Sequence, residues 1–487
     1  MLTQGDIISE MSDKTIRFNE EAIYQRSNED VKKHIEDICQ ALEVIEYIDF
    51  LGCEIEDDES KITSFQKINI DISRFSECTI RFKVTFKEEV KVVEKKFFIP
   101  KLVDDYFFYI NDVNYFPIWQ IVDKGVFVTS KLYSLKTLLM PIRFMYKRLV
   151  YYNMANDELQ GGCEFKLNLF KQKINYLYYY FAEYGLLDTL EYFGYSYSND
   201  DEDVDLSIVE SEDFEEMIES EDPAFTDYHW FHCYKKVYIR ASKKRFNKDL
   251  FDNSFLFSFI NIITDVKKVD DDPEIWKRVL GKMFTKSTNT QIAKAEKVLF
   301  SLRRILDERT KRLLVDIEPE DKEDIYAMLR WMLKNFSEFQ YQDNMNLKHK
   351  RVQCWEYLLQ PLLRLFSNMS YRILNTRNLS MKTLEKAFNI GPNFLVKRML
   401  NNELIRYNSC VNNMDLFGAS LKITFKGAGG LSDGSDIADR VRKVHKSYIG
   451  QFSLISTSAG EPGLTTTLTP FADISGGMFH PITERIG

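Results

Sequence analysis

The stretch VHKSYIGQFSLISTSAGEPGLTTTLTPFA, residues 444–472, differs in composition from the rest of this chain. It is rich in Gly, Ser and Thr, and four basic residues, Arg440, Arg442, Lys443 and Lys446, lie at or just before its start. Such a segment is either a solvated tail or backbone that packs closely against another molecule. The composition and motifs of the other residues distinguish between these two interpretations.

The bulk composition is that of a globular protein with several domains. Hydrophobic residues make up 44% of the 487 residues and aromatic residues 14%, which supplies enough apolar surface for a packed core. The length predicts roughly two to four domains. The formal net charge of -9 argues against a general nucleic-acid coat protein, although binding depends on local patches and not on the average.

The cysteines and the apolar runs indicate a soluble, intracellular protein without a membrane partner. The seven cysteines are odd in number and contain no Cys-x-x-Cys pair, which is typical of reduced structural thiols. The N-terminus lacks the pattern of a signal peptide. Lys or Arg interrupts every long apolar run, as in LLMPIRFMYKRLVYY at residues 138–152. The cysteines are Cys39, Cys53, Cys78, Cys163, Cys233, Cys354 and Cys410.

Alternating apolar residues predict strands in the first quarter of the chain. In TIRFKVTF, residues 79–86, every second residue is apolar, and INIDIS at 68–73 shows the same alternation. A period of two places one side of a strand in the core. Further strand-like sequence continues to about residue 122.

Helical spacing predicts that residues 131–345 are mainly helical. Between residues 292 and 306, apolar residues recur at intervals of three and four, with Lys294, Lys297, Arg303 and Arg304 between them. This pattern indicates an amphipathic helix with a basic outer side, which is more often a solvated face than a binding face. Residues 350–410 again predict apolar helices. The combination gives an α+β, multidomain fold.

Residues 200–222 contain thirteen acidic residues and no basic one. Repulsion between like charges favours an open, exposed insertion that contributes nothing to the core. Asp201, Asp203 and Asp205 have a spacing that can hold Mg²⁺, but no glycine shapes the loop and any acidic run contains such a match. We therefore predict no metal site here.

The segment HWFHC is the other candidate for a metal site. His229, His232 and Cys233 are suitable zinc ligands, but a tetrahedral site needs a fourth ligand and no matching pair occurs elsewhere. The neighbouring aromatic residues favour packing. The sequence shows no recognisable Ser/His/Asp triad either. We therefore predict neither catalytic nor metal-binding residues on this chain.

The segment KGAGGLSDG, residues 426–434, is rich in glycine without matching a phosphate-binding loop, since it lacks Gly-Lys-[Ser/Thr]. Basic residues flank it, and after Asp433, Asp436 and Asp439 are subtracted a charge of +3 remains. Basic residues around a glycine-rich loop suit contact with a phosphate backbone. An ordinary mobile loop is the alternative. The basic residues are Lys422, Lys426, Arg440, Arg442, Lys443 and Lys446.

Two stretches resemble a known family. GAGGL at Gly427–Leu431, VHKSYIG at 444–450 and GLTTTL at 463–468 are similar, in order and spacing, to the middle of the β subunit of multisubunit RNA polymerases. The family pattern there is G-P-G-G-L, then V-H-x-[ST]-H-[YW]-G, then E-T-P-E-G and G-L. FFYINDVNYFPIWQ at 107–120 resembles the family's G-x-F-I-I-N-G-x-E-R-V-I-V-x-Q. Its matching residues are Phe108, Ile110, Asn111, Ile118 and Gln120.

The resemblance implies that the chain is the N-terminal half of a β subunit, of the split type found in giant (jumbo) bacteriophages. The implied domains are a protrusion, a lobe and a fork region. The protrusion would comprise residues 1–130 and 346–410, the lobe 131–345 with the acidic insertion 200–222, and the fork 411–487.

The resemblance also implies a function and partners. The chain would take part in DNA-directed RNA synthesis, a nucleotidyl transfer, in the cytoplasm of a bacterial host. Catalytic Mg²⁺ would be bound by the other large subunit, with no cofactor on this chain. The partners would be the C-terminal half of β, β′ fragments, DNA template and nascent RNA, with a promoter-specificity subunit as a further candidate. The implied nucleic-acid-binding residues are Lys422, Lys426, Gly429, Gly430, Arg440, Arg442, Lys446, Thr457 and Gly460.

Some positions depart from the family pattern. E-T-P-E-G is replaced by STSAG at 456–460, with Ser456 and Ala459 in place of the two glutamates and Ser458 in place of the proline. Two alternatives stay open, of which these departures favour only the first. One is a non-catalytic scaffold derived from a β subunit, and the other is a stand-alone metal-dependent nucleotidyl enzyme that uses Asp201, Asp203 and Asp205.

Overall fold

Most of the chain is described by a computed structural model. Several predicted features fall partly or wholly outside it. They are the alternating residues Ile68, Ile70 and Ile72, the ends of the acidic run at 200–203 and 220–222, Cys354 and Cys410, and parts of the glycine-rich segment 426–434. The described residues are 28–57, 73–103, 107–128, 132–154, 158–198, 204–219, 227–235, 237–246, 250–267, 271–353, 356–376, 379–409, 412, 415, 418–419, 421–427, 430–431, 439–457, 462–469, 472, 474–475 and 477–480.

The chain divides into two compact units. The first comprises residues 1–124, 307–309 and 343–487, and the second comprises residues 125–306 and 310–342. The second unit is therefore an insertion in the sequence of the first. The assignment of the names protrusion, lobe and fork to parts of the chain stays a prediction.

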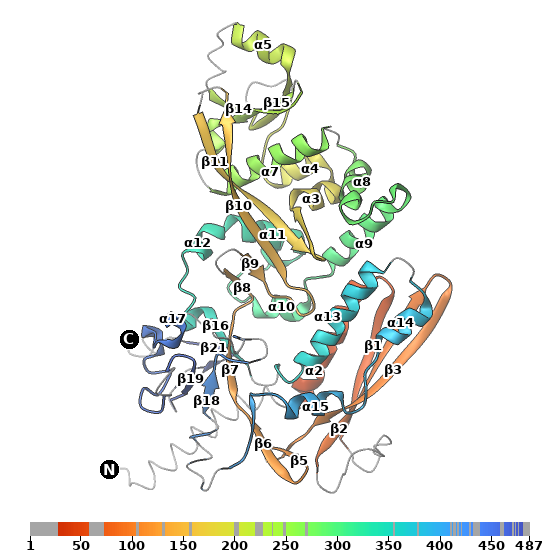
Figure 1. The fold of residues 1–487 in the computed structure, drawn as a ribbon, viewed down its shortest axis with the longest axis vertical. Helices are drawn as coiled ribbons and strands as arrows, with labels where there is room; N and C mark the ends of the chain where they lie inside the picture. Colours follow the sequence, from red (N-terminus) through yellow and green to blue (C-terminus); the bar gives the residue numbers. More distant parts are fainter. Residues whose placement is uncertain are drawn as a thin grey trace. The chain divides into compact units, whose positions relative to one another are not determined.

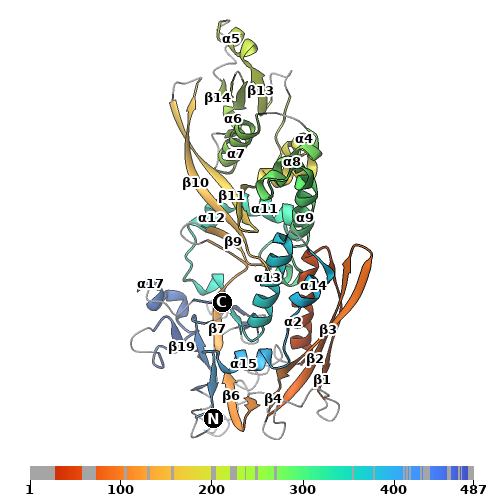
Figure 2. The same cartoon turned by 45° about the vertical axis from the view of Figure 1, so that its right-hand side comes forward.

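A three-stranded antiparallel sheet of order β1-β2-β3 forms one core of the first unit (Figures 1 and 2). The predicted alternation in residues 79–86 is confirmed, because Ile80, Phe82 and Val84 are fully buried. Phe82 packs against Phe366 and Phe388, with ring centroids 6.0 and 5.0 Å apart. The elements are α2 (Asn28–Gln40), η1 (Ala41–Val44), β1 (Ile48–Glu56), β2 (Phe75–Phe86), β3 (Glu89–Pro100), α13 (Gln360–Asn375), α14 (Met381–Ala387) and α15 (Phe394–Leu400).

Two further sheets of the first unit carry the stretches that resemble the polymerase subunit. In the four-stranded sheet β17-β6-β5-β4, Asn111 and Asp112 both have positive φ and connect β5 to β6, as a tight hairpin turn requires. The six-stranded sheet has the order β19-β18-β7-β16-β21-β20. The strands are β4 (Leu102–Val103), β5 (Phe107–Ile110), β6 (Val113–Pro117), β7 (Trp119–Asp123), β16 (Lys350–Gln353), β17 (Ile405–Tyr407), β18 (Lys422–Thr424), β19 (Thr465–Thr467), β20 (Ile474–Ser475) and β21 (Met478–Phe479).

The second unit contains a five-stranded sheet, so the prediction that residues 131–345 are mainly helical is wrong for its first part. The two long strands β10 and β11 pair along twelve-residue segments, where apolar residues alternate only over part of their length. The mixture of aromatic and basic residues in β10, and the two glycines and polar residues of β11, hid the strand pattern. The strands are β8 (Val126–Val128), β9 (Leu132–Leu135), β10 (Ile142–Asn153), β11 (Glu158–Leu169) and β12 (Gln172–Asn175).

The described part of the acidic run is also ordered. It forms β13 (Leu206–Glu210) and α5 (Ser211–Glu219), and β13 pairs with β15 (Val237–Ser242) in a sheet that ends with β14 (Tyr228–Tyr234). Leu206 and Phe214 are buried, and Phe214 stacks on Tyr238 at a centroid distance of 4.0 Å. The expectation that this run adds nothing to the core is wrong, because its few apolar residues form a buried side beneath the carboxylates.

Helices make up the remainder of the second unit. The predicted amphipathic helix is confirmed as α9 (Gln291–Arg303), which buries Ala295, Val298, Leu299 and Leu302. The other helical elements are α3 (Leu177–Tyr184), α4 (Leu186–Tyr192), α6 (Lys243–Phe246), α7 (Leu250–Val266), α8 (Pro273–Phe284), η5 (Thr288–Thr290), α10 (Glu308–Leu313), η6 (Glu320–Lys322), α11 (Ile325–Lys334) and α12 (Phe336–Gln340). The α+β, multidomain fold class is confirmed.

Two further predictions concern the cysteines and the apolar helices. The five cysteines of the described residues, Cys39, Cys53, Cys78, Cys163 and Cys233, are free and buried. Burial raises the pKa of the Cys233 thiol to about 12 and that of Cys163 to about 11. No helix within the described ranges has the length and hydropathy needed to span a bilayer.

Replacing Gly281 with Ala tests the packing of α8 against α9. A Cβ atom at this position would lie 2.0 Å from the backbone oxygen of Gln291, and backbone cannot move aside as a side-chain tip can. Alanine favours a helix by about 1 kcal/mol over glycine, but we expect the overlap to outweigh this and to destabilise the second unit by about 1–3 kcal/mol.

Chemical denaturation monitored by circular dichroism measures this change. Gly161→Ala is the matched control, because nothing lies within 4 Å of a Cβ atom added there. Equal stability of the two variants would contradict the close helix contact.

Candidate nucleic-acid interface

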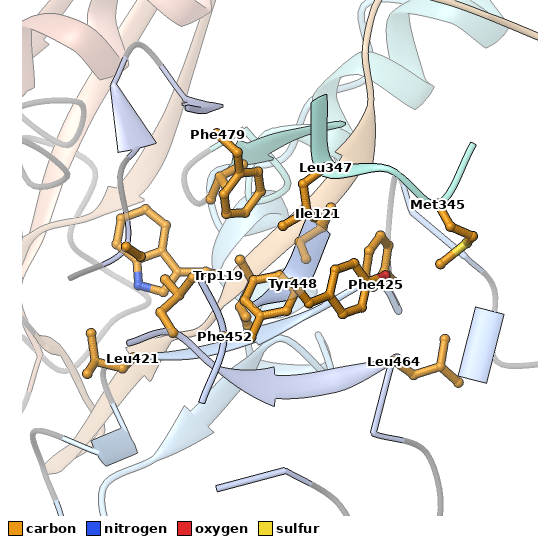
Figure 3. Close-up of a cluster of buried hydrophobic side chains, with 14 residues drawn as sticks. Trp119, Ile121, Met345, Leu347, Leu421, Phe425, Tyr448, Phe452, Leu464 and Phe479 are labelled. Atoms are coloured by element: carbon orange, nitrogen blue, oxygen red, sulfur yellow. The ribbon is translucent and has the colours of Figure 1, made fainter. Parts of the chain in front are cut away.

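The strand β7 joins the two stretches that resemble the polymerase subunit. It pairs in parallel with β18 on one side, and antiparallel with β16 on the other. A buried cluster lies against these strands, in which Trp119 and Ile121 of β7 meet residues from the C-terminal stretch (Figure 3). Those residues are Leu421, Ile423, Phe425, Tyr448, Phe452, Leu464, Leu468, Ala472 and Phe479.

The side chain of Gln120 connects β7 directly to the glycine-rich turn. This fully buried amide donates a hydrogen bond from Nε2 to the backbone oxygen of Lys426, at 2.9 Å. Its Oε1 accepts a hydrogen bond of 2.5 Å from Nε2 of Gln353 on β16. Both ends of one amide are therefore satisfied by partners 306 and 233 positions away in the sequence.

The network of buried polar groups continues from Gln353. Arg351 donates one hydrogen bond to Gln353 Oε1 at 3.2 Å and another to Glu356 Oε1 at 2.7 Å. Arg309 donates to the same carboxylate oxygen at 2.8 Å. Burial opposes ionisation of Glu356, but the two guanidinium groups outweigh it and lower the pKa of this carboxyl to about 2.

The glycines of the turn are required by the fold of this chain itself. Gly427 has a φ of +101°, a conformation that L residues rarely adopt. A Cβ at Gly430 would lie 2.4 Å from the backbone oxygen of Phe425 and 2.9 Å from Nε2 of Gln120. Backbone of Phe425 and the side chain of Gln120 therefore fill the space where a side chain at residue 430 would lie.

The residues of VHKSYIG form a clamp that sequence analysis missed. His445 accepts a hydrogen bond at Nδ1 from the backbone N–H of Ser447, at 3.2 Å, and its Nε2 lies 3.0 Å from Asp343 Oδ2. The Ser447 hydroxyl accepts from the backbone N–H of Leu347 at 3.0 Å. This Asp/His/Ser arrangement fixes η8 (Lys446–Tyr448) to the segment before β16, and it was invisible in the sequence because Asp343 lies a hundred positions away.

The basic segment 441–443 packs onto Gly463. The backbone N–H of Gly463 donates to the oxygen of Arg442 at 2.8 Å, and a Cβ at Gly463 would lie 2.3 Å from the oxygen of Lys443. The conformation of α17 (Asp439–Arg442) and the residues after it therefore depends on a glycine at this position. The close packing explains why Gly-Leu follows the basic residues in this sequence.

The structure brings some of the predicted nucleic-acid-binding residues to one sheet and its connections. Lys422 on β18, Lys426 in the turn, Arg442 and Thr457 are half-buried, and Lys446 is exposed. For Arg440 only the position in α17 is described, whereas Gly429 and Gly460 lie outside the described residues.

Neither candidate metal site forms a ligand cluster within the described residues, where no group of three or more His, Cys, Asp or Glu side chains could hold a metal ion. His229 is buried and accepts from Asn153, while His232 is exposed and donates to the oxygen of Lys235. Asp201 and Asp203 lie outside the described residues. Asp205 accepts hydrogen bonds from the backbone and hydroxyl of Ser196.

Comparison with known families gives one match. A family model described as "Non-virion RNA polymerase subunit" matches residues 3–477, a range that contains both stretches joined by Gln120. No curated protein matches the chain.

Replacing Gln120 with Met tests the polar link. The volume is nearly kept, but the Lys426 carbonyl and the Gln353 amide each lose a buried partner, which should cost about 2–4 kcal/mol in total. Hydrogen exchange measures the local effect: the amides of Gly427, Gly430 and Leu431, which bond within the turn, should exchange faster. Gln172→Met, at an exposed position of β12, is the control and should leave these rates unchanged.

Acid should weaken the first unit through Glu356. A carboxyl whose pKa is lowered on folding contributes stability above its ordinary pKa, and that stability is lost as pH falls from about 4.5 to about 2. Denaturation curves across this range should show the loss. Glu356→Gln should flatten this part of the pH dependence and cost about 3–5 kcal/mol at pH 7, because it leaves two guanidinium groups without their carboxylate.

Glu94→Gln serves as the control for this substitution. Glu94 forms an exposed ion pair with Arg81 at 3.0 Å, which is worth at most about 1 kcal/mol. A pH dependence that is identical in the wild-type and Glu356→Gln proteins would rule out the role of Glu356.

Proposed function

Because the chain belongs to the family of non-virion RNA polymerase subunits, we propose that it is the N-terminal half of a split β subunit whose fork region contacts template DNA and the RNA–DNA hybrid. Membership makes it a subunit of a viral, nucleotide-transferring enzyme with other polymerase subunits as partners. The β role, the split and the nucleic-acid contacts are the proposal.

One observation carries the β assignment. The residues similar to the β subunit occur in two stretches, and Gln120 of the first hydrogen-bonds to Lys426 at the start of the second. The two stretches also share a sheet and a hydrophobic cluster. Chance similarity in two unrelated places gives no reason for such a contact, whereas a common fold does.

Charge and packing support nucleic-acid contact by the residues after the turn. Lys443 and Lys446 are exposed and Arg442 is half-buried, on a segment whose backbone is held by Gly463 and by the His445 clamp. Charged side chains on a fixed backbone can meet phosphates without a large entropic cost. Lys422, Lys426 and Arg440 would extend this contact, with Gly429, Gly430, Thr457 and Gly460 shaping its wall.

The chemistry would be divided among subunits. A 3′ hydroxyl attacks the α-phosphate of a nucleotide with the help of two Mg²⁺ ions, which the other large subunit would bind. This chain would hold and orient nucleic acid in the cytoplasm of an infected bacterium. Leu454 and Ile455, which are 55% and 96% exposed, offer apolar surface that the C-terminal half of β or a β′ fragment would cover.

The test uses the polymerase purified through a tag on this chain from cells that produce all its subunits. Arg442→Ala combined with Lys446→Ala should lower transcript synthesis at least about 100-fold, since each charged contact is worth about 1.5–3 kcal/mol. Subunit stoichiometry, measured by mass spectrometry, should not change. The matched control is Lys397→Ala with Arg398→Ala, at exposed positions of α15.

Three outcomes separate the alternatives. Full activity of the Arg442/Lys446 variant with normal assembly would favour the non-catalytic scaffold. Activity of the chain by itself, abolished by removing residues 200–222, would favour the stand-alone metal enzyme. Purification without polymerase partners would contradict the β assignment.

A further inference from the structure

The hairpin of α8 and α9 collects basic side chains that the proposed function does not use. The two helices pack closely where Gly281 meets Gln291, and η5 lies in the connection between them (Figures 1 and 2). Residues 273–297 contain six basic residues and two acidic ones, a local charge of +4 in a chain of net charge -9. The basic residues are Lys277, Arg278, Lys282, Lys286, Lys294 and Lys297.

Three of these six basic residues have no acidic partner among the described residues. Lys277 lies 3.8 Å from Glu296, which offsets its charge. Arg278, Lys282 and Lys286 are exposed and form no ion pair with any residue that the structure describes. Burial and the neighbouring charge of Lys297 lower the pKa of Lys294, as expected where positive charge is concentrated.

The geometry suits a phosphate backbone. Arg278 and Lys282 are one helical turn apart, so they lie on the same side of α8, about 6 Å apart along its axis, where both can contact neighbouring phosphates of one strand. Ser287, Thr288 and Asn289 are exposed in the connection and add hydrogen-bonding groups of the kind that contact phosphate and sugar. Of the two aromatic residues in 273–297, Trp276 is buried and Phe284 is half-buried, which leaves little ring surface on which an unpaired base could stack.

We propose that the α8–α9 hairpin binds the phosphate backbone of duplex DNA, independently of base sequence. An isolated helix with a basic outer side is usually only solvated, but here the basic residues of two helices and their connection share one hairpin. This site belongs to the second unit, whereas Lys422–Lys446 belong to the first, and it does not depend on the role proposed for those residues.

The experiment measures binding of the full-length chain to a fluorescent duplex of about 20 base pairs by anisotropy, between about 50 and 200 mM salt. Lys282→Glu combined with Lys286→Glu should lower affinity at least about tenfold at about 100 mM salt. Loss of two phosphate contacts should also reduce the slope of log K against log salt by about 2. Lys282→Gln with Lys286→Gln should reduce the slope by the same amount with a smaller loss of affinity.

The matched control, Arg143→Glu with Lys244→Glu, changes the net charge equally at exposed positions of β10 and α6 and should leave affinity within about twofold. Circular dichroism verifies the fold of every variant. Absence of duplex binding, an unchanged slope in both hairpin variants, or an equal loss in the control would overturn the proposal. Unchanged DNA binding with loss of a copurified acidic protein would identify the hairpin as a protein-docking surface instead.

Discussion

The buried amide of Gln120 is the interaction on which the rest of the candidate interface depends. A buried amide without partners would cost more than the strand contact around it yields, so the glycine-rich turn and Gln353 must both be in place before β7 is stable between β18 and β16. The network then extends through Arg351 to Glu356. This series of hydrogen bonds thus fixes the register between strands whose residues lie more than two hundred positions apart in the sequence.

The polar groups of this network are hydrogen-bonded within the chain, so the network needs no ligand to be stable. The glycines of the turn and Gly463 are needed for close backbone packing, so their presence alone is no argument for a ligand. Under the proposed function, contact with nucleic acid would therefore come from exposed side chains such as those of Lys443 and Lys446. If the chain positions nucleic acid as proposed, a rigid frame with exposed basic residues would suit that role.

Sequence patterns predicted the elements in which one period dominates. The alternation at Ile80, Phe82 and Val84 and the helical spacing of α9 both reflect a single buried face. These patterns failed for β10, where aromatic and basic residues mix, and for β11, which contains two glycines and several polar residues. They also failed for the acidic run, where a few apolar residues such as Val204, Leu206 and Phe214 anchor a strand and a helix. The matching motif positions in the first stretch included Gln120, but its partners, like Asp343 of the His445 clamp, are set by tertiary pairing and cannot be seen in local spacing.

The same limit explains why the basic residues of α9 were assigned to a solvated face. When α9 is considered alone, Lys294 and Lys297 only indicate a solvated polar face. The close approach of Gly281 to Gln291 changes this, since it fixes the end of α8 with Arg278 and Lys282 beside the start of α9. Water and salt screen the repulsion among these exposed charges, but a polyanion would gain from their concentration on one hairpin. A fold that holds basic residues together by backbone packing, in a chain that is acidic overall, thereby favours a negatively charged partner at that hairpin.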